Sequence, residues 1–292
     1  MERIGFIGLG IMGKSMARNL MKSGYKLNAF ARHPEKVEDI VKEGLQMYTT
    51  IEDCVKDCDV VITMVGYPKD VEEVYFGEQN ILDSTKSGAC LIDMTSTSPT
   101  LAQRIYREGS TRGFHVLDAP VTGGDVGAKN GTLSILVGGD HADFKRCLPL
   151  LRAMGSSINY QGPAGYGQHA KIANQIMVAG ALAGVCEALA YAECENLDQQ
   201  ALLQAVSGGA AASGQLKALG PKILDGDFAP GFFLKHFIKD MMLVEDEADK
   251  VGLELGMIKQ VLRECRVLEE KGMGDYGTQV LIEYYRKHSK LT

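Results

Sequence analysis

The chain has 292 residues, a hydrophobic fraction of 45% and a formal net charge of −6. This length exceeds the usual size of a single domain, so two domains are expected, and the apolar fraction is ordinary for a protein with a full core. The acidic balance, with lysines and arginines interleaved among acids, argues against a nucleic-acid partner.

Neither a signal peptide nor a membrane-spanning helix is expected. Glycines interrupt the first apolar segment, and we find no run of about 18 apolar residues. The seven cysteines, an odd number without a secretory signal, indicate reduced thiols and a cytoplasmic protein. Cys54 and Cys58 lie four residues apart, but no histidine is near them in the sequence, so no metal site is expected.

The first expected strand, Arg3–Ile7, leads directly into a Gly8-x-Gly10-x-x-Gly13 motif, and a helical pattern follows. This context is typical of dinucleotide binding: the first glycine permits a tight turn, the second admits a pyrophosphate, and the third lets the helix pack on the strand. N–H groups at the start of the helix would bind the phosphates. A plain glycine-rich turn is the alternative. The expected cofactor contacts here are Gly8, Gly10, Ile11, Met12 and Gly13.

The second expected strand, Lys26–Phe30, bears on the choice of cofactor. Sites for NAD usually carry Asp or Glu at the end of this strand, where it bonds the ribose hydroxyl. No acid stands there, whereas Arg32 does and could pair with a 2′-phosphate. The sequence therefore favours NADP over NAD, and NAD stays open if Arg32 is a solvated loop residue.

The rest of the first half continues to alternate short apolar runs with helical patterns. Further strands are expected at Val60–Val65, Ala89–Asp93, His115–Val121 and Leu133–Gly138. Helices are expected at Met12–Ser23, Pro34–Glu43, Thr50–Lys56, Asp70–Phe76, Pro99–Gly109 and Ala142–Met154. This alternation predicts an α/β Rossmann domain with a mostly parallel, doubly wound sheet.

Two strand ends are expected to lie along the cofactor, because ligands of open α/β sheets bind outside the carboxyl ends of the strands. Met64 and Val65 end one strand, and Ser96 follows another. The alternative for Ser96 is a helix cap before Pro99.

The segment Asp118-Ala119-Pro120-Val121-Thr122-Gly123-Gly124 ends a strand at a hydroxyl residue followed by two glycines. Consecutive glycines expose backbone N–H groups to an anion, and a carboxylate is a suitable guest. A plain Gly-Gly turn is the alternative.

After residue 162 the pattern becomes helical. A long helix is expected from Gly167 to about Glu195, followed by helices at Asp198–Val206, Leu234–Val251, Met257–Lys271 and Gln279–Lys287. Turns are expected at Gly208-Gly209, Gly220-Pro221, Ala229–Gly231 and Gly272–Gly274. We therefore predict two domains: residues 1–162 as the cofactor-binding Rossmann domain, and residues 163–292 as an all-helical substrate and oligomerisation domain joined by the long helix.

The long helix carries Lys171, Asn174 and Gln175 at spacings that place them on one face. In a cleft, a lysine of lowered pKa can serve as a general acid or base; the alternative is a surface lysine. His169 points elsewhere, and a structural role is favoured for it. Further along, the pair Lys239-Asp240 follows an aromatic-rich turn. Lys239 could reach cofactor or substrate and Asp240 could fix Lys171 or Asn174, or the two could be a simple charge pair on a helix face.

Taken together, these segments resemble the β-hydroxyacid dehydrogenase family over essentially the whole chain. Its four signatures occur in order: the glycine motif continuing to Leu20, the run from Asp118 to Gly124, the run from Gly165 to Asn174, and Lys239-Asp240. The resemblance implies an NAD(P)-dependent enzyme of small 3-hydroxy acids and their semialdehydes, assembled as a homodimer or homotetramer.

The resemblance also implies roles for residues. Lys171 matches the catalytic lysine, the run Thr122–Gly124 matches the substrate-carboxylate loop, and Lys239 matches the lysine that closes over the cofactor. Asn174 matches the amide beside the substrate, and Gln175, also expected at the substrate, stands where many members carry a second asparagine. The Asn-Gln pair and Val206–Ala210 resemble the tartronate semialdehyde reductase branch; 3-hydroxyisobutyrate dehydrogenase and glyoxylate/succinic semialdehyde reductase are alternatives. Imine reductases usually replace the lysine, and non-catalytic relatives lose it, so Lys171 argues against both.

Overall fold

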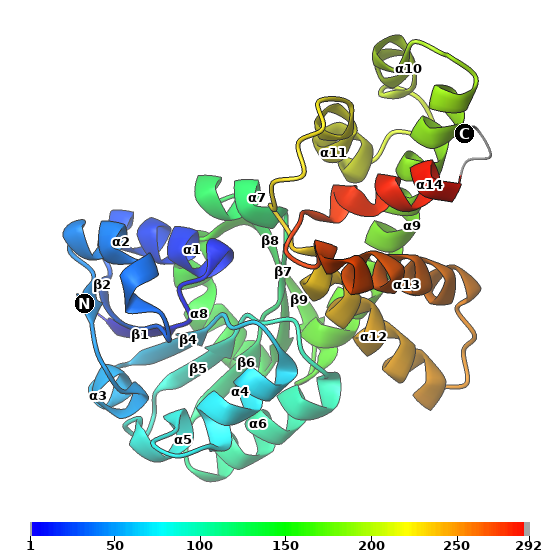
Figure 1. Cartoon of the computed structure of the whole chain (residues 1–292). Helices are drawn as coiled ribbons and strands as arrows, with labels where there is room; N and C mark the ends of the chain where they lie inside the picture. The colour runs from blue at the N-terminus through cyan, green and yellow to red at the C-terminus, as the bar shows by residue number, and fades with distance from the viewer. Residues whose placement is uncertain (1, 289–292) are drawn as a thin grey trace. The chain divides into compact units, whose positions relative to one another are not determined.

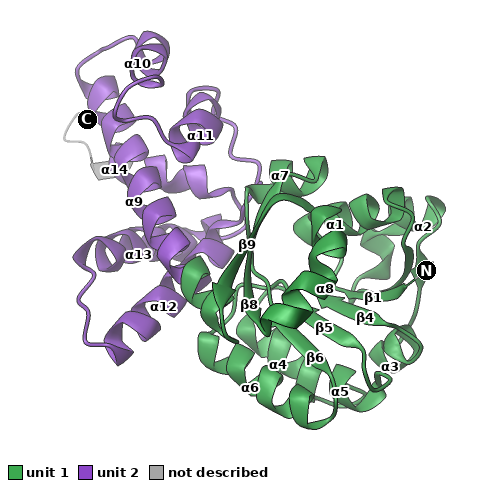
Figure 2. Cartoon of the chain, turned by 180° about the vertical axis from the view of Figure 1, so that it is seen from behind, with its two compact units in different colours: residues 1–171 green, residues 172–292 purple. Residues whose placement is uncertain are grey.

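The computed structural model describes residues 2–288 and divides into two units, Met1–Lys171 and Ile172–Thr292 (Figure 2). The border between the units lies inside helix α9 (Tyr166–Cys194). The domain boundary expected after residue 162 coincides with the end of strand β9 (Gly155–Gly162), nine residues before the border between the units. This expected boundary stays a prediction.

Unit 1 is built on a mostly parallel sheet with helices on both faces (Figure 1). Its strands in the described residues are β1 (Arg3–Ile7), β2 (Lys26–Phe30), β3 (Gln46–Met47), β4 (Val60–Thr63), β5 (Cys90–Asp93), β6 (His115–Asp118), β7 (Val121–Thr122), β8 (Leu133–Gly139) and β9 (Gly155–Gly162). Their order is β3-β2-β1-β4-β5-β6-β8-β7, with β9 paired in parallel to β8. Two pairings in the described sheet, β6 with β8 and β7 with β8, are antiparallel. The predicted α/β Rossmann class is confirmed.

The helices of unit 1 follow the strands as the alternating pattern requires. They are α1 (Ile11–Lys22), α2 (Glu38–Lys42), α3 (Ile51–Val55), α4 (Pro68–Phe76), α5 (Ile81–Ser84), α6 (Pro99–Thr111), α7 (Gly124–Asn130) and α8 (His141–Arg152), with a 3₁₀ turn, η1, at Pro34–Lys36. The helix expected over Pro34–Glu43 is thus split into η1 and α2. The short helices α5 and α7 were not expected, since α7 contains two glycines and has low helix propensity.

Both faces of the sheet are buried, which explains why the strands read as continuous apolar runs. Alternate residues enter opposite cores: Phe6 and Ile62 pack on one side of the sheet, while Ile7 and Val61 pack on the other. The central strands therefore have little freedom to slip in register, because a shift of one residue would exchange the two faces.

The sheet departs from the expected strands in three places, of which the first is the two-residue strand β3, which was not expected. The strand expected over His115–Val121 is interrupted at Ala119-Pro120, and β6 and β7 pair with β8 on either side of the break. Pro120 has no N–H to donate to a ladder, which accounts for the interruption. Strand β9 was missed because it is a polar edge strand with few buried side chains.

In the part of the chain described, the secondary structure of unit 2 is helical apart from one isolated bridge between Phe233 and Gly277. It contains α9 from residue 172 onward, α10 (Gln199–Val206), α11 (Gly214–Leu224), α12 (Leu234–Lys250), α13 (Gly256–Leu268) and α14 (Ile282–His288), with a π turn, η2, at Glu269–Met273 and a 3₁₀ turn, η3, at Thr278–Leu281. The turn expected at Gly220-Pro221 was wrong, because both residues lie inside α11. A side chain at Gly220 would meet Leu203 at 3.1 Å, so close packing against α10 explains a glycine within that helix.

Helix α9 is long and apolar enough to cross a membrane by length and composition, with a mean hydropathy of 1.5 over 18 residues. Core helices of globular domains pass the same test. Leu182, Cys186 and Leu189 of α9 pack in the core of unit 2, together with Phe237 of α12 and Leu262 of α13.

Candidate active site

The glycine motif forms a cradle with the geometry that a dinucleotide requires. A Cβ added at Gly8, whose φ is +99°, would lie 2.3 Å from the carbonyl oxygen of Met64, and one added at Gly13 would lie 2.0 Å from the carbonyl oxygen of Gly8. At Gly10 an added Cβ would meet nothing within 4 Å. The first and third glycines are therefore needed for the close approach of β1, α1 and the β4 loop, and the second leaves open space above the turn.

The first turn of α1 is suited to an anion. Gly10 stands at the N-cap and offers no side chain to the first N–H groups, and the turn contains no acidic residue. Ile11 is exposed and Met12 is partly exposed beside these groups. The positive end of the helix dipole and its N–H groups therefore remain available for a pyrophosphate.

The strand ends named from the sequence lie at one edge of unit 1. Across the sheet, Ile7 is paired in register with Thr63, Thr63 with Asp93, and Asp93 with Asp118. Met64 and Val65 follow β4 directly, and the loop after β5 carries Ser96. The carboxyl ends of parallel strands form the ligand-binding edge of such sheets.

Ser98, and not Ser96, caps helix α6. Its hydroxyl oxygen accepts a hydrogen bond from the backbone N–H of Leu101 at 3.1 Å. The capping role considered for Ser96 is therefore taken by another residue, and contact with the cofactor stays the prediction for Ser96.

Arg32 lies at the end of β2 as expected, but two carboxylates of α4 engage it. Its Nη2 lies 2.8 Å from Oδ1 of Asp70 and 3.1 Å from Oε2 of Glu73. The Asp70 side chain is almost fully buried, whereas half of the Arg32 side chain is exposed. The sequence pattern gave no sign of this pairing, because Asp70 and Glu73 lie about forty residues further along the chain.

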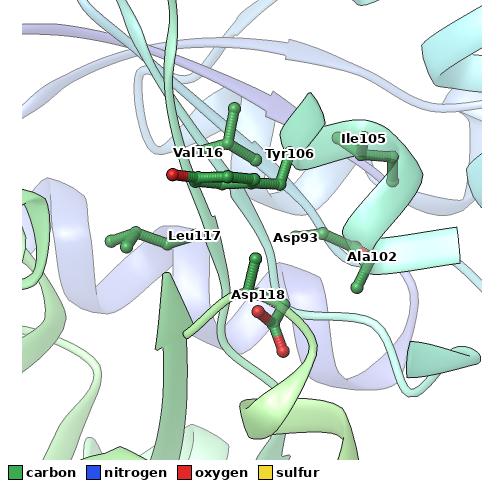
Figure 3. Close-up of a pocket in the computed structure, with 8 residues that line it drawn as sticks. Asp93, Ala102, Ile105, Tyr106, Val116, Leu117 and Asp118 are labelled. Atoms are coloured by element: carbon green, nitrogen blue, oxygen red, sulfur yellow. The ribbon is translucent and has the colours of Figure 1, made fainter. Parts of the chain in front are cut away.

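Asp93 and Asp118, which end β5 and β6, line a small cavity together with Tyr106 and Ala102 of α6 (Figure 3). Asp93 is 3% exposed, and its Oδ1 accepts hydrogen bonds from the Thr63 hydroxyl at 2.7 Å and the Thr95 N–H at 3.1 Å. Its Oδ2 meets no donor among residues 2–288. Burial raises the pKa of Asp93 to about 6, and the neighbouring Asp118 adds to the rise.

This raised pKa predicts a specific pH dependence of stability. Between pH about 4 and 6 the folded chain retains a proton on Asp93 that the unfolded chain has released, so this group's contribution to the free energy of unfolding falls as the pH rises. Asp93→Asn keeps an oxygen for Thr63 and Thr95 and cannot ionise. Relative to wild type, we expect the variant to gain about 2–3 kcal/mol between pH 4 and 7. Urea unfolding across this range measures the gain, and parallel pH profiles for the two proteins would contradict the assignment.

The proposed substrate loop and the proposed catalytic lysine adjoin within unit 1. Gly123 and Gly124, with φ of +124° and +65°, form the turn between β7 and α7 that we call the carboxylate loop together with Thr122. The Nζ of Lys171 donates to the carbonyl oxygen of Val121, directly before this loop, at 2.9 Å. Lys171 is 9% exposed, so the interpretation of a surface lysine does not hold.

Two buried polar residues that meet at the start of α9, Asp118 and Gln168, carry contacts that the sequence patterns did not reveal. Asp118 accepts hydrogen bonds from the backbone N–H groups of Gly165 and Gln168 at the start of α9, at 2.8 and 2.9 Å. Gln168, which is 1% exposed, bonds the loop after β5 through its side-chain amide. Both residues lie within the sequence motifs described above, but the sequence does not show that they are buried, and their burial is what indicates a role beyond forming a turn or a helix.

The site residues named in unit 2 form one chain of contacts. The Asn174 amide donates to the Gln175 oxygen at 2.8 Å, and the Gln175 amide donates to Asp240 Oδ2 at 2.7 Å. Asp240 Oδ1 lies 2.8 Å from Nζ of Lys239. Asp240 thus holds Gln175 and reaches Asn174 only through it. His169 is exposed and its ring makes an edge contact with Tyr166, and the structural role favoured for it stays a prediction.

Comparison with known proteins identifies the family. Residues 3–162 match the model of the NAD-binding domain of 6-phosphogluconate dehydrogenase, and residues 165–285 match that of the NAD-binding domain of NADP-dependent 3-hydroxyisobutyrate dehydrogenase. The chain belongs to the β-hydroxyacid dehydrogenase family. It is therefore an NAD(P)-dependent oxidoreductase.

Three relatives illustrate the similarity. An uncharacterized oxidoreductase of Bacillus subtilis is 46% identical, covering 98% of this chain and 99% of its own. The 2-hydroxy-3-oxopropionate reductase of Escherichia coli is 38% identical, covering 87% and 86%. The structure of Mycobacterium tuberculosis 3-hydroxyisobutyrate dehydrogenase with L-serine is 28% identical, with a TM-score of 0.87, covering 98% and 99%.

Proposed function

We propose that the enzyme interconverts a small 3-hydroxy acid and its semialdehyde, with 2-hydroxy-3-oxopropionate (tartronate semialdehyde) as the first candidate substrate. The contact between Lys171 Nζ and the carbonyl oxygen of Val121 supports this proposal most directly. It brings a nearly buried amine next to the carboxylate loop, which is the arrangement needed to act on a substrate held by its carboxylate.

Each group of site residues has a separate role in the proposed reaction. The carboxylate loop orients the substrate through its N–H groups and the Thr122 hydroxyl. Lys171 holds a proton at Nζ, gives it to the substrate oxygen in reduction and takes it back in oxidation. Asn174, one turn along α9, orients the same oxygen through its amide. The nicotinamide cofactor, when bound, supplies or accepts the hydride. Gly8, Gly10, Ile11, Met12 and Gly13, with Met64, Val65, Ser96 and Lys239, would hold it.

We further propose NADP as the favoured cofactor, with NAD also accepted. Both carboxylates that contact Arg32 use its Nη2, and the guanidinium has five N–H donors. Half of the side chain is exposed, which leaves room for a 2′-phosphate. Asp70 and Glu73 would oppose the phosphate by charge, so the preference for NADP is expected to be modest.

Glu73→Gln tests this balance. The change removes one of the two negative charges beside Arg32, and the Asp70 contact remains. We expect the ratio of kcat/KM for NADPH to that for NADH to rise about two- to fivefold, as befits a partly exposed charge. Glu72→Gln is the matched control, because Glu72 lies beside Glu73 on α4 but pairs with Arg104. An equal ratio in wild type and Glu73→Gln would contradict the proposal that Arg32 and its carboxylate partners determine the preference between NADPH and NADH.

The substrate assignment rests on the Asn174-Gln175 pair, which resembles the tartronate semialdehyde branch. Asp240 and Asn174 hold the Gln175 amide from both ends, so the pair is a fixed part of unit 2. 3-Hydroxyisobutyrate and glyoxylate or succinic semialdehyde are the alternatives within the family.

A panel of four aldehydes tests the assignment: tartronate semialdehyde, succinic semialdehyde, glyoxylate and methylmalonate semialdehyde, each with NADPH and NADH. We expect turnover of carboxylate-bearing aldehydes, with the highest kcat/KM for tartronate semialdehyde. Tight cofactor binding without turnover of any of the four would contradict the proposal and favour an imine reductase or a non-catalytic module.

We also propose that the enzyme assembles as a homodimer or homotetramer and that it is located in the cytoplasm. The large apolar side chains of Met177 and Tyr191 on α9 are 68% and 65% exposed. Exposed side chains of this size are common at interfaces between copies of a chain.

A further inference from the structure

Gln168 joins two segments of unit 1 that the proposed chemistry needs in a fixed arrangement. It lies in the first turn of α9, three residues before Lys171. Its side-chain nitrogen donates to the carbonyl oxygen of Thr95 at 2.8 Å, and its side-chain oxygen accepts from the N–H of Thr97 at 3.0 Å. One amide thus bonds both sides of the residue between them, Ser96, in the loop after β5.

The same turn of α9 is held from a second direction. Asp118, at the end of β6, accepts from the N–H groups of Gly165 and Gln168 and so satisfies the start of the helix. Glycine is required where the chain passes this carboxylate: an added Cβ at Gly167 would lie 2.6 Å from the Asp118 carbonyl oxygen, and one at Gly138 would lie 2.5 Å from its Oδ1. The helix start is therefore fixed against the sheet with little space around it.

The Thr95 backbone is in turn tied to the edge of the sheet that is expected to face the cofactor. The Thr95 hydroxyl accepts from the N–H of Val65, and the Thr95 N–H donates to Asp93. A continuous set of buried and partly buried hydrogen bonds therefore runs from the residues after β4, through the loop that carries Ser96, to the helix that carries Lys171. All of these groups lie in unit 1.

We propose that Gln168 is a positioning residue for catalysis. Its two hydrogen bonds to the Thr95 and Thr97 backbone fix the first turn of α9, and so fix the position of Lys171 relative to the strand ends that are expected to face the cofactor. The inference rests on the proposed role of Lys171 as proton donor. Proton transfer requires donor and acceptor within hydrogen-bond reach, and a displacement of about 1 Å can lower a rate about a hundredfold. The buried partners Thr95 and Thr97 have backbone groups that would be left unpaired without the amide, so the loop would shift to find other partners.

We call the two hydrogen bonds from the Gln168 amide to Thr95 and Thr97 the lock. Gln168→Met tests the lock, because methionine fills a similar volume and makes neither hydrogen bond. In the cofactor-free protein, we expect faster hydrogen exchange in residues 94–98 and 165–171. In the complete reaction, we expect kcat to fall about 10- to 100-fold, while KM for the aldehyde stays within about twofold, because the Gln168 amide bonds the loop after β5 and not the carboxylate loop.

Gln279→Met is the matched control. Gln279 is also 1% exposed and its amide also bridges two backbone groups, the carbonyl oxygens of Asp227 and Ala229, but it lies in unit 2. We expect this variant to lose stability to a similar degree and to leave exchange in residues 94–98 unchanged. Faster exchange there in both variants would mean that the effect is general loosening, and would overturn the proposal.

A double-mutant cycle with Lys171→Met separates positioning from a merely structural role. If Gln168 acts through Lys171, the double variant turns over no more slowly than Lys171→Met alone. An additional 10- to 100-fold loss in the double variant would overturn the proposal. Wild-type turnover of Lys171→Met would instead refute the proposed function, while hydrogen exchange would still decide whether the lock exists.

Discussion

We expect Lys171→Met to lower kcat by about three to four orders of magnitude and to leave cofactor affinity within about twofold. General acid–base catalysis contributes about 10²- to 10⁴-fold, and methionine cannot carry the proton. The variant loses the hydrogen bond from Nζ to the carbonyl oxygen of Val121, which lies outside the glycine cradle. Steady-state turnover of tartronate semialdehyde, together with titration of NADPH fluorescence, measures the two quantities.

Two further variants define what Lys171 supplies. Lys171→Arg keeps the positive charge but cannot release a proton near neutral pH, so it stays as inactive as Lys171→Met if the role is proton transfer. Lys129→Met, in the exposed last turn of α7, removes a positive charge from the same unit and is expected to retain activity. Recovery of turnover in Lys171→Arg would show that charge alone is sufficient and would contradict the proton-donor role.

We expect Gly13→Ala to destabilise unit 1 by roughly 3 kcal/mol and to lower cofactor affinity at least about a hundredfold. The added methyl group would lie 2.0 Å from the carbonyl oxygen of Gly8, which is backbone and cannot rotate away. Helix α1 must move off the strand, as in other overpacked contacts, and its N-terminal N–H groups move with it. Urea unfolding and NADPH titration measure the two losses.

Gly10→Ala separates the two effects. An added Cβ at Gly10 meets nothing within 4 Å, and the backbone φ of −72° suits alanine. We expect stability to change by less than about 0.5 kcal/mol, while NADPH affinity falls about tenfold because the methyl group occupies the space left for the pyrophosphate. Unchanged affinity in Gly10→Ala would contradict the assignment of the space above Gly10 to the pyrophosphate. Unchanged stability in Gly13→Ala would contradict the need for glycine where α1 approaches Gly8.

Most patterns that depend on neighbours in the chain could be predicted from the sequence, although the turn expected at Gly220-Pro221 was wrong. The glycine motif, the apolar strands and the long helix each follow from spacing within about thirty residues, because turn geometry, pleat and helical periodicity are local properties. Strand β9 and helix α11 were not predictable in this way. The first is polar and is defined by its partner β8, and the second contains Gly220-Pro221 and is held by packing on Leu203.

The sequence by itself determined the fold class, the family and the residue types of the candidate site. Only the tertiary structure decided what each site residue contacts. It paired Arg32 with Asp70 and Glu73, buried Asp93 beside Asp118, and joined Gln168 to Thr95 and Thr97 across more than seventy residues. These contacts join residues distant in the chain, and the free energy of each depends on burial and on the partner's position, neither of which local spacing encodes.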